Sequence, residues 1–261
     1  MTRAPTTQES QPPAPSETRE AVLQLQGVGM RFGEITALKD VDLEVYRGEI
    51  LGIAGPNGSG KSTLFNAVAG VYRPTGRILL EGANIVGLGP DRVCRKGIAR
   101  TFQIPQVFGS MTAEDNIRVG AHFGRAIRGG MKEAINDAVA TVGLEDKRSV
   151  VAEHLNLLGR KLLMLAAALA TDPFLLLLDE PMGGLTPAEI HEFGTLITRL
   201  NRESGMTVIV IEHKVRKLVE LSDRLMILYN GELVALGLPD EVVNDPRVID
   251  LYLGGSFHAA C

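Results

Sequence analysis

Three short, almost continuous apolar runs stand out along the chain, at residues 49–54, 174–178 and 207–211. Runs of this kind are typical of strands buried on both faces, because the parallel sheets of α/β proteins carry helices on both sides. Between the runs the apolar positions take helical spacing, for example at residues 63–69, which end at Gly70. Alternating strands and helices predict a parallel sheet with helical connections.

The sequence after the second apolar run contains a pattern that is typical of the start of a helix. Thr186, Pro187 and Glu189 form the pattern of a capping box with proline at the first helical position. We therefore expect a helix to begin there. The apolar side chains on one of its faces are Ile190, Phe193, Ile197 and Leu200.

A hairpin and another helix complete the pattern. Asn230 and Gly231 separate strand-like runs at residues 225–229 and 232–236, and this dipeptide favours a tight two-residue turn. Residues 131–142 have the spacing of an amphipathic helix.

Composition narrows the class of protein. With 261 residues, the chain is long enough for one α/β domain with an insertion or for two small domains. Its net charge of −4 gives no electrostatic reason to expect a nucleic acid partner. The longest apolar run, residues 162–170, is too short to span a bilayer, and no signal peptide opens the chain. Cys94 and Cys261 show no metal-binding spacing, which predicts reduced thiols in a cytosolic protein.

The first residues differ from the rest of the chain. Residues 1–20 are rich in proline, threonine, serine and glutamate, so they lack the apolar side chains needed for a packed core. We expect a disordered tail there.

The loop between the strand at 49–54 and the helix at 63–69 fits the phosphate-binding pattern G-x-x-x-x-G-K-[ST]. Glycines let successive backbone N–H groups surround a phosphate, and the helix N-terminus adds its positive end. Lys61 should reach the β- and γ-phosphates of ATP, and Ser62 should bind Mg²⁺. The alternative is a glycine-rich turn with a surface lysine. The predicted nucleotide-binding residues are Gly55, Asn57, Gly58, Ser59, Gly60, Lys61, Ser62 and Thr63.

Two carboxylates follow the leucine-rich run at residues 174–178. Ligands of an open α/β sheet bind at the carboxyl ends of its strands, so Asp179 fits a Mg²⁺ ligand. Glu180 fits a general base or a residue that positions water, because hydrolysis needs a proton acceptor beside the γ-phosphate. The alternative is an acidic turn at the end of a strand.

Three more segments suggest a family. Residues 100–103 end in Gln103, His213 follows the strand at 207–211, and Phe32 lies in residues 30–33. With the phosphate loop and the two carboxylates, they make residues 22–255 resemble the ATP-binding subunit of an ABC transporter. The resemblance implies that Gln103 senses Mg²⁺ and the attacking water, that His213 contacts the γ-phosphate, and that Phe32 stacks on adenine. Taken alone, they fit a loop amide, a surface or capping histidine, and a strand core residue.

The resemblance also implies a fold. We expect an α/β P-loop NTPase of the ABC cassette type, with a RecA-like parallel-sheet core, an antiparallel β subdomain and an inserted helical subdomain. The short strands of the antiparallel subdomain should lie in residues 22–49. The expected units are a tail at 1–20, an ATPase core at 21–103 and 161–238, a helical insertion with the signature at 104–160, and a C-terminal segment at 239–261.

The signature segment departs from the family pattern. Family members dimerise head to tail, and each offers a Leu-Ser-Gly-Gly-Gln type of segment to the partner's ATP. Asn156 stands at the serine position and the glycine is displaced to Gly159; both residues are expected to bind the partner's ATP. Met164 and Ala167 replace an acid and an arginine that are common there, so this helix is apolar nearly all round and is either deeply buried or shielded by a partner. Thr186 stands where Asp or Asn is usual.

Residues 100–117, 179–187 and 237–254 resemble the branch that takes up branched-chain amino acids, which also includes transporters for urea and short amides. This implies an ATPase with ATP and Mg²⁺ at the cytoplasmic face of the inner membrane. Its implied partners are integral membrane permease subunits, an identical or different second cassette and, indirectly, a solute-binding protein. A non-hydrolysing regulatory cassette and a soluble ABC ATPase of translation or DNA repair are the alternatives.

Overall fold

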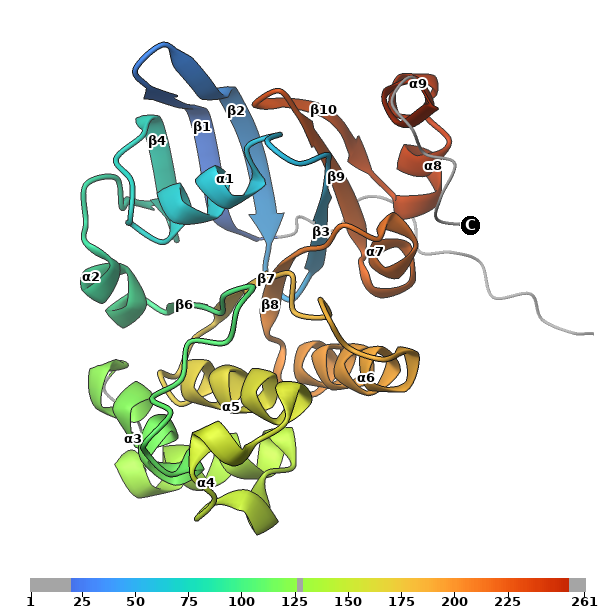
Figure 1. The fold of residues 1–261 in the computed structure, drawn as a ribbon. Helices are drawn as coiled ribbons and strands as arrows, with labels where there is room; N and C mark the ends of the chain where they lie inside the picture. Colours follow the sequence, from blue (N-terminus) through green and yellow to red (C-terminus); the bar gives the residue numbers. More distant parts are fainter. Residues whose placement is uncertain (1–19, 126–128, 254–261) are drawn as a thin grey trace, which may run out of the picture.

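The computed structural model describes residues 20–125 and 129–253, which form two sheets with helices packed around them (Figure 1). The tail predicted at residues 1–20 lies outside the described residues except for Glu20, and so does Cys261.

The larger sheet has six strands in the order β10-β9-β3-β8-β7-β6, and only β10 runs antiparallel to its neighbour. The three apolar runs form β3, β7 and β8, and every residue of these strands is buried, as predicted. The hairpin at Asn230 and Gly231 is also confirmed, and both of these residues have positive φ. The strands are β3 (Ile50–Ala54), β6 (Ile98–Arg100), β7 (Leu175–Asp179), β8 (Thr207–Ile211), β9 (Arg224–Tyr229) and β10 (Glu232–Gly237).

The smaller sheet is antiparallel, with the order β2-β1-β4-β5. Its strands are β1 (Ala21–Phe32), β2 (Ile35–Tyr46), β4 (Thr75–Leu80) and β5 (Ala83–Asn84). The prediction of short strands in this region was wrong, because β1 and β2 have 12 residues each. The register between them shifts at several points, and such bulges let a strand bend and continue past irregular positions that would otherwise end it.

The two faces of the larger sheet bury separate apolar clusters. Alternate residues of β7 point to opposite sides, so Leu176 and Leu178 join one cluster while Leu175 and Leu177 join the other. The first cluster includes side chains of α3, α4, α5 and α6. The second lies between the sheet, α1 and the smaller sheet. The core around the phosphate loop is therefore built from residues of both sheets.

The helices confirm several of the predicted ends. Helix α6 begins with a complete capping box, in which Thr186 and Glu189 bond reciprocally. Helix α4 spans the predicted residues 131–142. The helices are α1 (Lys61–Val68), α2 (Pro90–Arg95), α3 (Ala113–Phe123), α4 (Met131–Val142), α5 (Leu157–Leu169), α6 (Pro187–Ser204), α7 (Val215–Leu221), α8 (Pro239–Val243) and α9 (Pro246–Leu253), with 3₁₀ turns at Glu145–Lys147 and Ala152–His154.

Helices α3, α4 and α5 gather at one end of the molecule, away from the smaller sheet (Figure 1). At Gly120 of α3, a Cβ atom would lie 2.1 Å from the carbonyl oxygen of Ala167 in α5, so glycine allows these helices to pack closely. Most side chains of α5 are buried, which favours the first of the two predicted alternatives, a deeply buried helix, over shielding by a partner. Helix α5 crosses residue 160, where a boundary was predicted; that boundary stays a prediction. Among the described residues, we find no helix with the length and apolar character of a membrane span.

Candidate nucleotide site

The phosphate loop joins β3 to α1, as predicted, and close backbone contacts fix two of its glycines, Gly55 and Gly60. Gly55, Gly58 and Gly60 have positive φ angles of 154°, 78° and 107°. A Cβ atom on Gly55 would lie 2.1 Å from the carbonyl oxygen of Leu228, and one on Gly60 would lie 2.5 Å from that of Ala37. Only glycine fits these positions, since any larger residue would clash with the backbone of β9 or β2.

Lys61 is drawn into the loop that it follows. Its ammonium group donates to the carbonyl oxygens of Gly55 at 2.8 Å and Pro56 at 2.9 Å, and only 6% of the residue is exposed. Burial lowers the pKa of Lys61, and the nearby charges of Glu180 and Asp179 oppose that shift. The alternative of a surface lysine therefore does not hold. These bonds to neutral carbonyls can be exchanged for bonds to phosphate oxygens.

A cavity of about 410 Å³ opens in front of the loop. Besides the loop and the start of α1, its walls contain Ala37, Gln103, Glu180 and His213. The fold thus brings all three predicted catalytic residues to the phosphate loop, from the segments after β6, β7 and β8.

Glu180 is held from two sides. Its carboxylate oxygens lie 2.6 Å from His213 Nε2 and 2.6 Å from Gln103 Nε2. The backbone of Glu180 has a φ of 48°, a conformation that costs a non-glycine residue about 1–3 kcal/mol. Such strain persists only where surrounding contacts impose it, and here it directs the side chain toward Gln103 and His213. The carboxylate of Glu180 is therefore held in a defined position next to the phosphate loop.

Asp179 ends β7 and is bound by a residue that the sequence did not single out. Its Oδ2 lies 2.8 Å from Arg100 Nη2, and both side chains are about nine-tenths buried. Arg100 also donates to Asn66 of α1. Because β6 pairs with β7, the end of β6 places Arg100 beside Asp179. The only sequence signal was a charged residue three positions before Gln103.

The donors near the loop suit a hard cation. Ser62 offers a hydroxyl, Asp179 a carboxylate and Gln103 an amide, and oxygen donors of these types are the ones that Mg²⁺ prefers. Among the described residues, no group of three or more His, Cys, Asp or Glu side chains could hold a metal. Ser62 and Gln103 line the cavity, whereas Asp179 lies outside its walls with Oδ2 bonded to Arg100. An ion held by these donors would take its remaining ligands from phosphate and water.

Five of the predicted site residues do not line this cavity: Phe32, Gly55, Asn156, Gly159 and Asp179. Phe32 is 42% exposed at the end of β1 and packs edge-on against Tyr72, so the strand-core alternative does not fit. Asn156 caps α5: its side-chain oxygen accepts the N–H of Gly159 at 2.8 Å. Leu157, between them in sequence, is 40% exposed.

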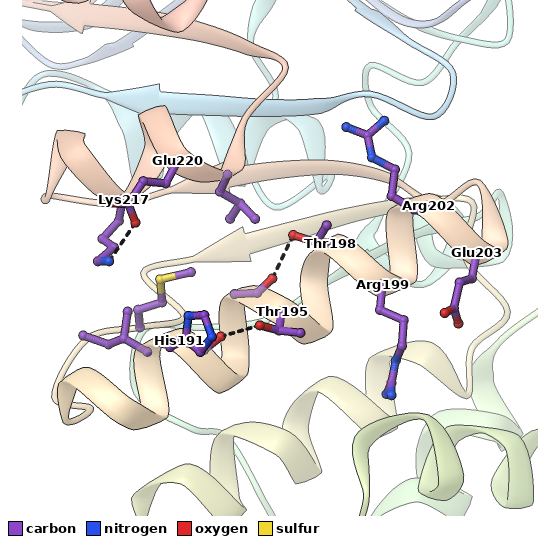
Figure 2. A pocket seen from close by; sticks show the side chains of 12 residues that line it. His191, Thr195, Thr198, Arg199, Arg202, Glu203, Lys217 and Glu220 are labelled. Atoms are coloured by element: carbon purple, nitrogen blue, oxygen red, sulfur yellow. Dashed lines mark hydrogen bonds and ion pairs between the residues drawn. The ribbon is translucent and has the colours of Figure 1, made fainter. Parts of the chain in front are cut away.

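A larger cavity, about 570 Å³, lies between α6 and α7 and shares no lining residue with the first (Figure 2). Some of its polar groups bond within their own helices: Thr195 donates to the carbonyl of His191, and Lys217 donates to Glu220 (Figure 2). Arg199 and Arg202 donate instead to Thr141 and Asp223, outside α6. None of the predicted site residues lines it. We therefore assign nucleotide binding to the smaller cavity.

Comparisons with known proteins agree with this geometry. Residues 38–183 match the family model "ABC transporter", and residues 232–258 match "Branched-chain amino acid ATP-binding cassette transporter". The chain is 35% identical over 251 residues to the high-affinity branched-chain amino acid transport ATP-binding protein LivG of Escherichia coli, covering 90% of this chain and 98% of LivG. It is 34% identical to BraF of Pseudomonas aeruginosa, covering 89% and 98%.

The fold is likewise similar to a solved cassette. A crystal structure of the ADP conformation of MJ1267, an ATP-binding cassette of an ABC transporter, has a TM-score of 0.80, 30% identity, and coverage of 90% of this chain and 99% of that one. The parallel-sheet core, the antiparallel sheet and the helices around them are those of this class. The chain therefore belongs to the ABC transporter family, as one of its ATP-binding and ATP-hydrolysing cassettes.

Proposed function

We propose that this cassette drives the import of branched-chain or related amino acids or amides. The observation that carries the solute class is the match of residues 232–258 to the branched-chain cassette model, supported by the identity to LivG and BraF. Solute recognition belongs to other subunits, so the site geometry supports the ATPase role and the likeness supports the solute.

For hydrolysis, we propose that Glu180 accepts a proton from a water that attacks the γ-phosphate. Support comes from the convergence of Gln103 and His213 on its carboxylate, 2.6 Å away on each side. The two residues keep the carboxylate in place, and each can turn a donor toward the water or the γ-phosphate. Positioning of this kind is most of what a phosphoryl-transfer enzyme contributes, because the transition state needs little covalent help.

The phosphates would be held by the loop residues 55–63. Lys61 and the N-terminal amides of α1 oppose the phosphate charge. Mg²⁺ would be held by Ser62 and Asp179, with Gln103 nearby, and would neutralise charge on the β- and γ-phosphates. Phe32 is exposed enough to stack on adenine.

A second cassette would complete the site. Asn156 and Gly159 lie outside the cavity of their own chain, as expected of residues that serve a partner's ATP. A dimeric cassette structure bound to ADP and phosphate, 26% identical with a TM-score of 0.73, supports this arrangement. The γ-phosphate would hold the two cassettes together, and hydrolysis would release them.

A groove beside the site fits a membrane subunit. A cavity of about 280 Å³ lies between α2 and α5, and Phe102, Met164 and Ala167 are among its mainly apolar walls. Ile104 and Phe108, in the segment after Gln103, are 71% and 55% exposed. We propose that a cytoplasmic segment of a permease subunit docks there, which would place the cassette at the cytoplasmic face of the inner membrane. A solute-binding protein would act only through the permease.

The first test is steady-state Mg²⁺-ATPase activity of the purified chain at increasing concentration. We expect the rate to rise more than linearly with protein, because each site needs a second cassette. Glu180→Gln should still bind ATP, lose turnover and accumulate as a dimer. Normal hydrolysis by Glu180→Gln would exclude Glu180 as the base.

The solute class needs a separate test. The chain should be reconstituted in vesicles with the permease subunits that copurify with it. ATP-dependent uptake of leucine, with ribose as the control, is the expected result. Uptake of ribose without leucine would overturn the proposed solute class and leave the ATPase role intact.

A further inference from the structure

Two buried charged residues lie beneath the catalytic segments and have no part in the site described above. Lys161 of α5 is 2% exposed, and Glu212, between β8 and His213, is 6% exposed. Neither lines the phosphate-loop cavity. In sequence, Lys161 follows Arg160 at the start of a helix and resembles an ordinary surface lysine.

The ammonium group of Lys161 joins two of the catalytic segments through their backbones. It donates to the carbonyl oxygen of Glu180 at 3.3 Å and to that of Gln103 at 3.4 Å. These two residues also meet through their side chains at 2.6 Å. Lys161 therefore contacts the backbones of Gln103 and Glu180, the same two residues whose side chains meet in the cavity.

Glu212 holds the segment that follows Glu180. Its carboxylate accepts the backbone N–H of Met182 at 2.8 Å. The N–H of Glu180 itself donates to the carbonyl oxygen of Ile211, the residue before Glu212. The strained backbone of Glu180 is thus fixed on one side by β8 and on the other by Lys161.

The two buried charges support one another. Burial lowers the pKa of Lys161 and raises that of Glu212, while each charge opposes the shift of the other. The two side chains form no direct ion pair, but each charge offsets part of the cost of burying the other.

We propose that Lys161 and Glu212 are positioning residues for ATP hydrolysis, which fix the backbones of Gln103, Glu180 and Met182 from the helical side of the site. Through this pair, a movement of α5 alters the placement of the Glu180 carboxylate without touching the phosphate loop. The inference rests on the role proposed for Glu180.

The test is the separation of turnover from nucleotide binding in Lys161→Met, which removes the charge at similar side-chain length. We expect kcat to fall about 10- to 100-fold, because misplacement of a reacting group by about 1 Å has effects of this order. KM for ATP and the affinity for a fluorescent ATP analogue should change less than about threefold, because the contacts of Lys61 remain. Lys217→Met, at a half-buried lysine of α7 outside the nucleotide cavity, is the matched control and should keep both constants.

Two further single variants keep the test decisive if Lys161→Met unfolds, and a double variant sharpens it if Lys161→Met folds. Lys161→Arg restores the charge and should recover much of kcat. Glu212→Gln keeps the shape and should lower kcat. The double variant Lys161→Met/Glu212→Gln should lose less than the product of the single losses, since both residues hold the backbone around Glu180.

The outcomes distinguish this inference from the function on which it rests. If Lys161→Met turns over ATP at the full rate while Glu180→Gln is inactive in the same assay, the positioning role is overturned and Glu180 remains the base. A loss of ATP affinity equal to the loss of kcat would also overturn it. Full turnover by Glu180→Gln would remove the proposed base itself.

Discussion

Helices α1 and α5 both begin with a segment expected to face the γ-phosphate of an ATP, yet they begin in opposite ways. Gly60 precedes α1 with a left-handed backbone, and no side chain caps that helix. Asn156 precedes α5 with an extended backbone, and its side chain already binds the N–H of Gly159. The N-terminus of α1 has no side-chain cap and can bind a ligand. At the N-terminus of α5, the Asn156 side chain already accepts one of the backbone N–H groups.

This difference indicates what each helix N-terminus can bind within a single chain. An uncapped N-terminus next to a glycine loop is a complete anion site within one chain. A capped start offers fewer backbone donors, so under the proposed function α5 would contribute mainly the Asn156 amide, and only to an ATP that another chain holds. The contrast predicts that changes at α1 abolish binding, while changes at α5 affect turnover.

The largest effect is expected for Lys61→Ala. The variant removes the cation that lies among the loop carbonyls, so affinity for ATP should fall by about a hundredfold or more, in line with the loss of charge-assisted hydrogen bonds to phosphate. Titration with a fluorescent ATP analogue measures this, and Lys39→Ala, at an exposed lysine of β2, is the control. Unchanged affinity would mean that the loop does not hold the phosphates.

A smaller and more selective effect is expected at Asn156. Asn156→Ala should lower turnover at least about tenfold, because it removes a donor proposed to face the transition-state charge. The affinity of the single chain for ATP should stay within about twofold of that of the unchanged protein. Asn156→Asp keeps the helix cap and places a negative charge at the γ-phosphate, so it should lose turnover as well. If Asn156→Asp hydrolyses ATP normally, Asn156 is only a helix cap. The difference between the starts of α1 and α5 then concerns local structure and has no bearing on hydrolysis.

The smallest effect is expected at a third helix start. Thr186 caps α6 through a reciprocal bond with Glu189, so Thr186→Ala should lower the free energy of unfolding by about 1 kcal/mol. Denaturant unfolding measures this loss, and Thr186→Ser should recover it. Turnover should stay within about twofold; a large loss would show that this threonine serves catalysis as well as the helix.

Local patterns were sufficient for much of the fold. The buried strands, the hairpin, α4 and the α6 cap each depend on a few neighbouring residues, and each lies where the sequence placed it. The phosphate loop was recognised from its local motif, although two of its glycines also pack against the backbones of β9 and β2.

Features that depend on distant partners were missed. The length of β1 and β2 depends on bulges in their pairing, which leave no short-range signal. Arg100 meets Asp179 only because β6 pairs with β7, and Lys161 is buried only because α5 lies under the segments after those strands. A charged side chain looks the same in sequence whether it faces solvent or an opposite charge across the fold.

Helix α5 begins beside Asn156, carries Lys161 in its second turn and presents Met164 to the groove beside α2. Its 13 residues span about 20 Å, and a helix of this length is stiff, so the three positions move as one body. In mechanical terms α5 is a lever. A tilt of about 5° about one end displaces the other by about 2 Å, enough to break or form hydrogen bonds. A force applied to α5 in the groove would therefore displace the residues at its N-terminus, which are proposed to face the partner's nucleotide, because the helix bends little.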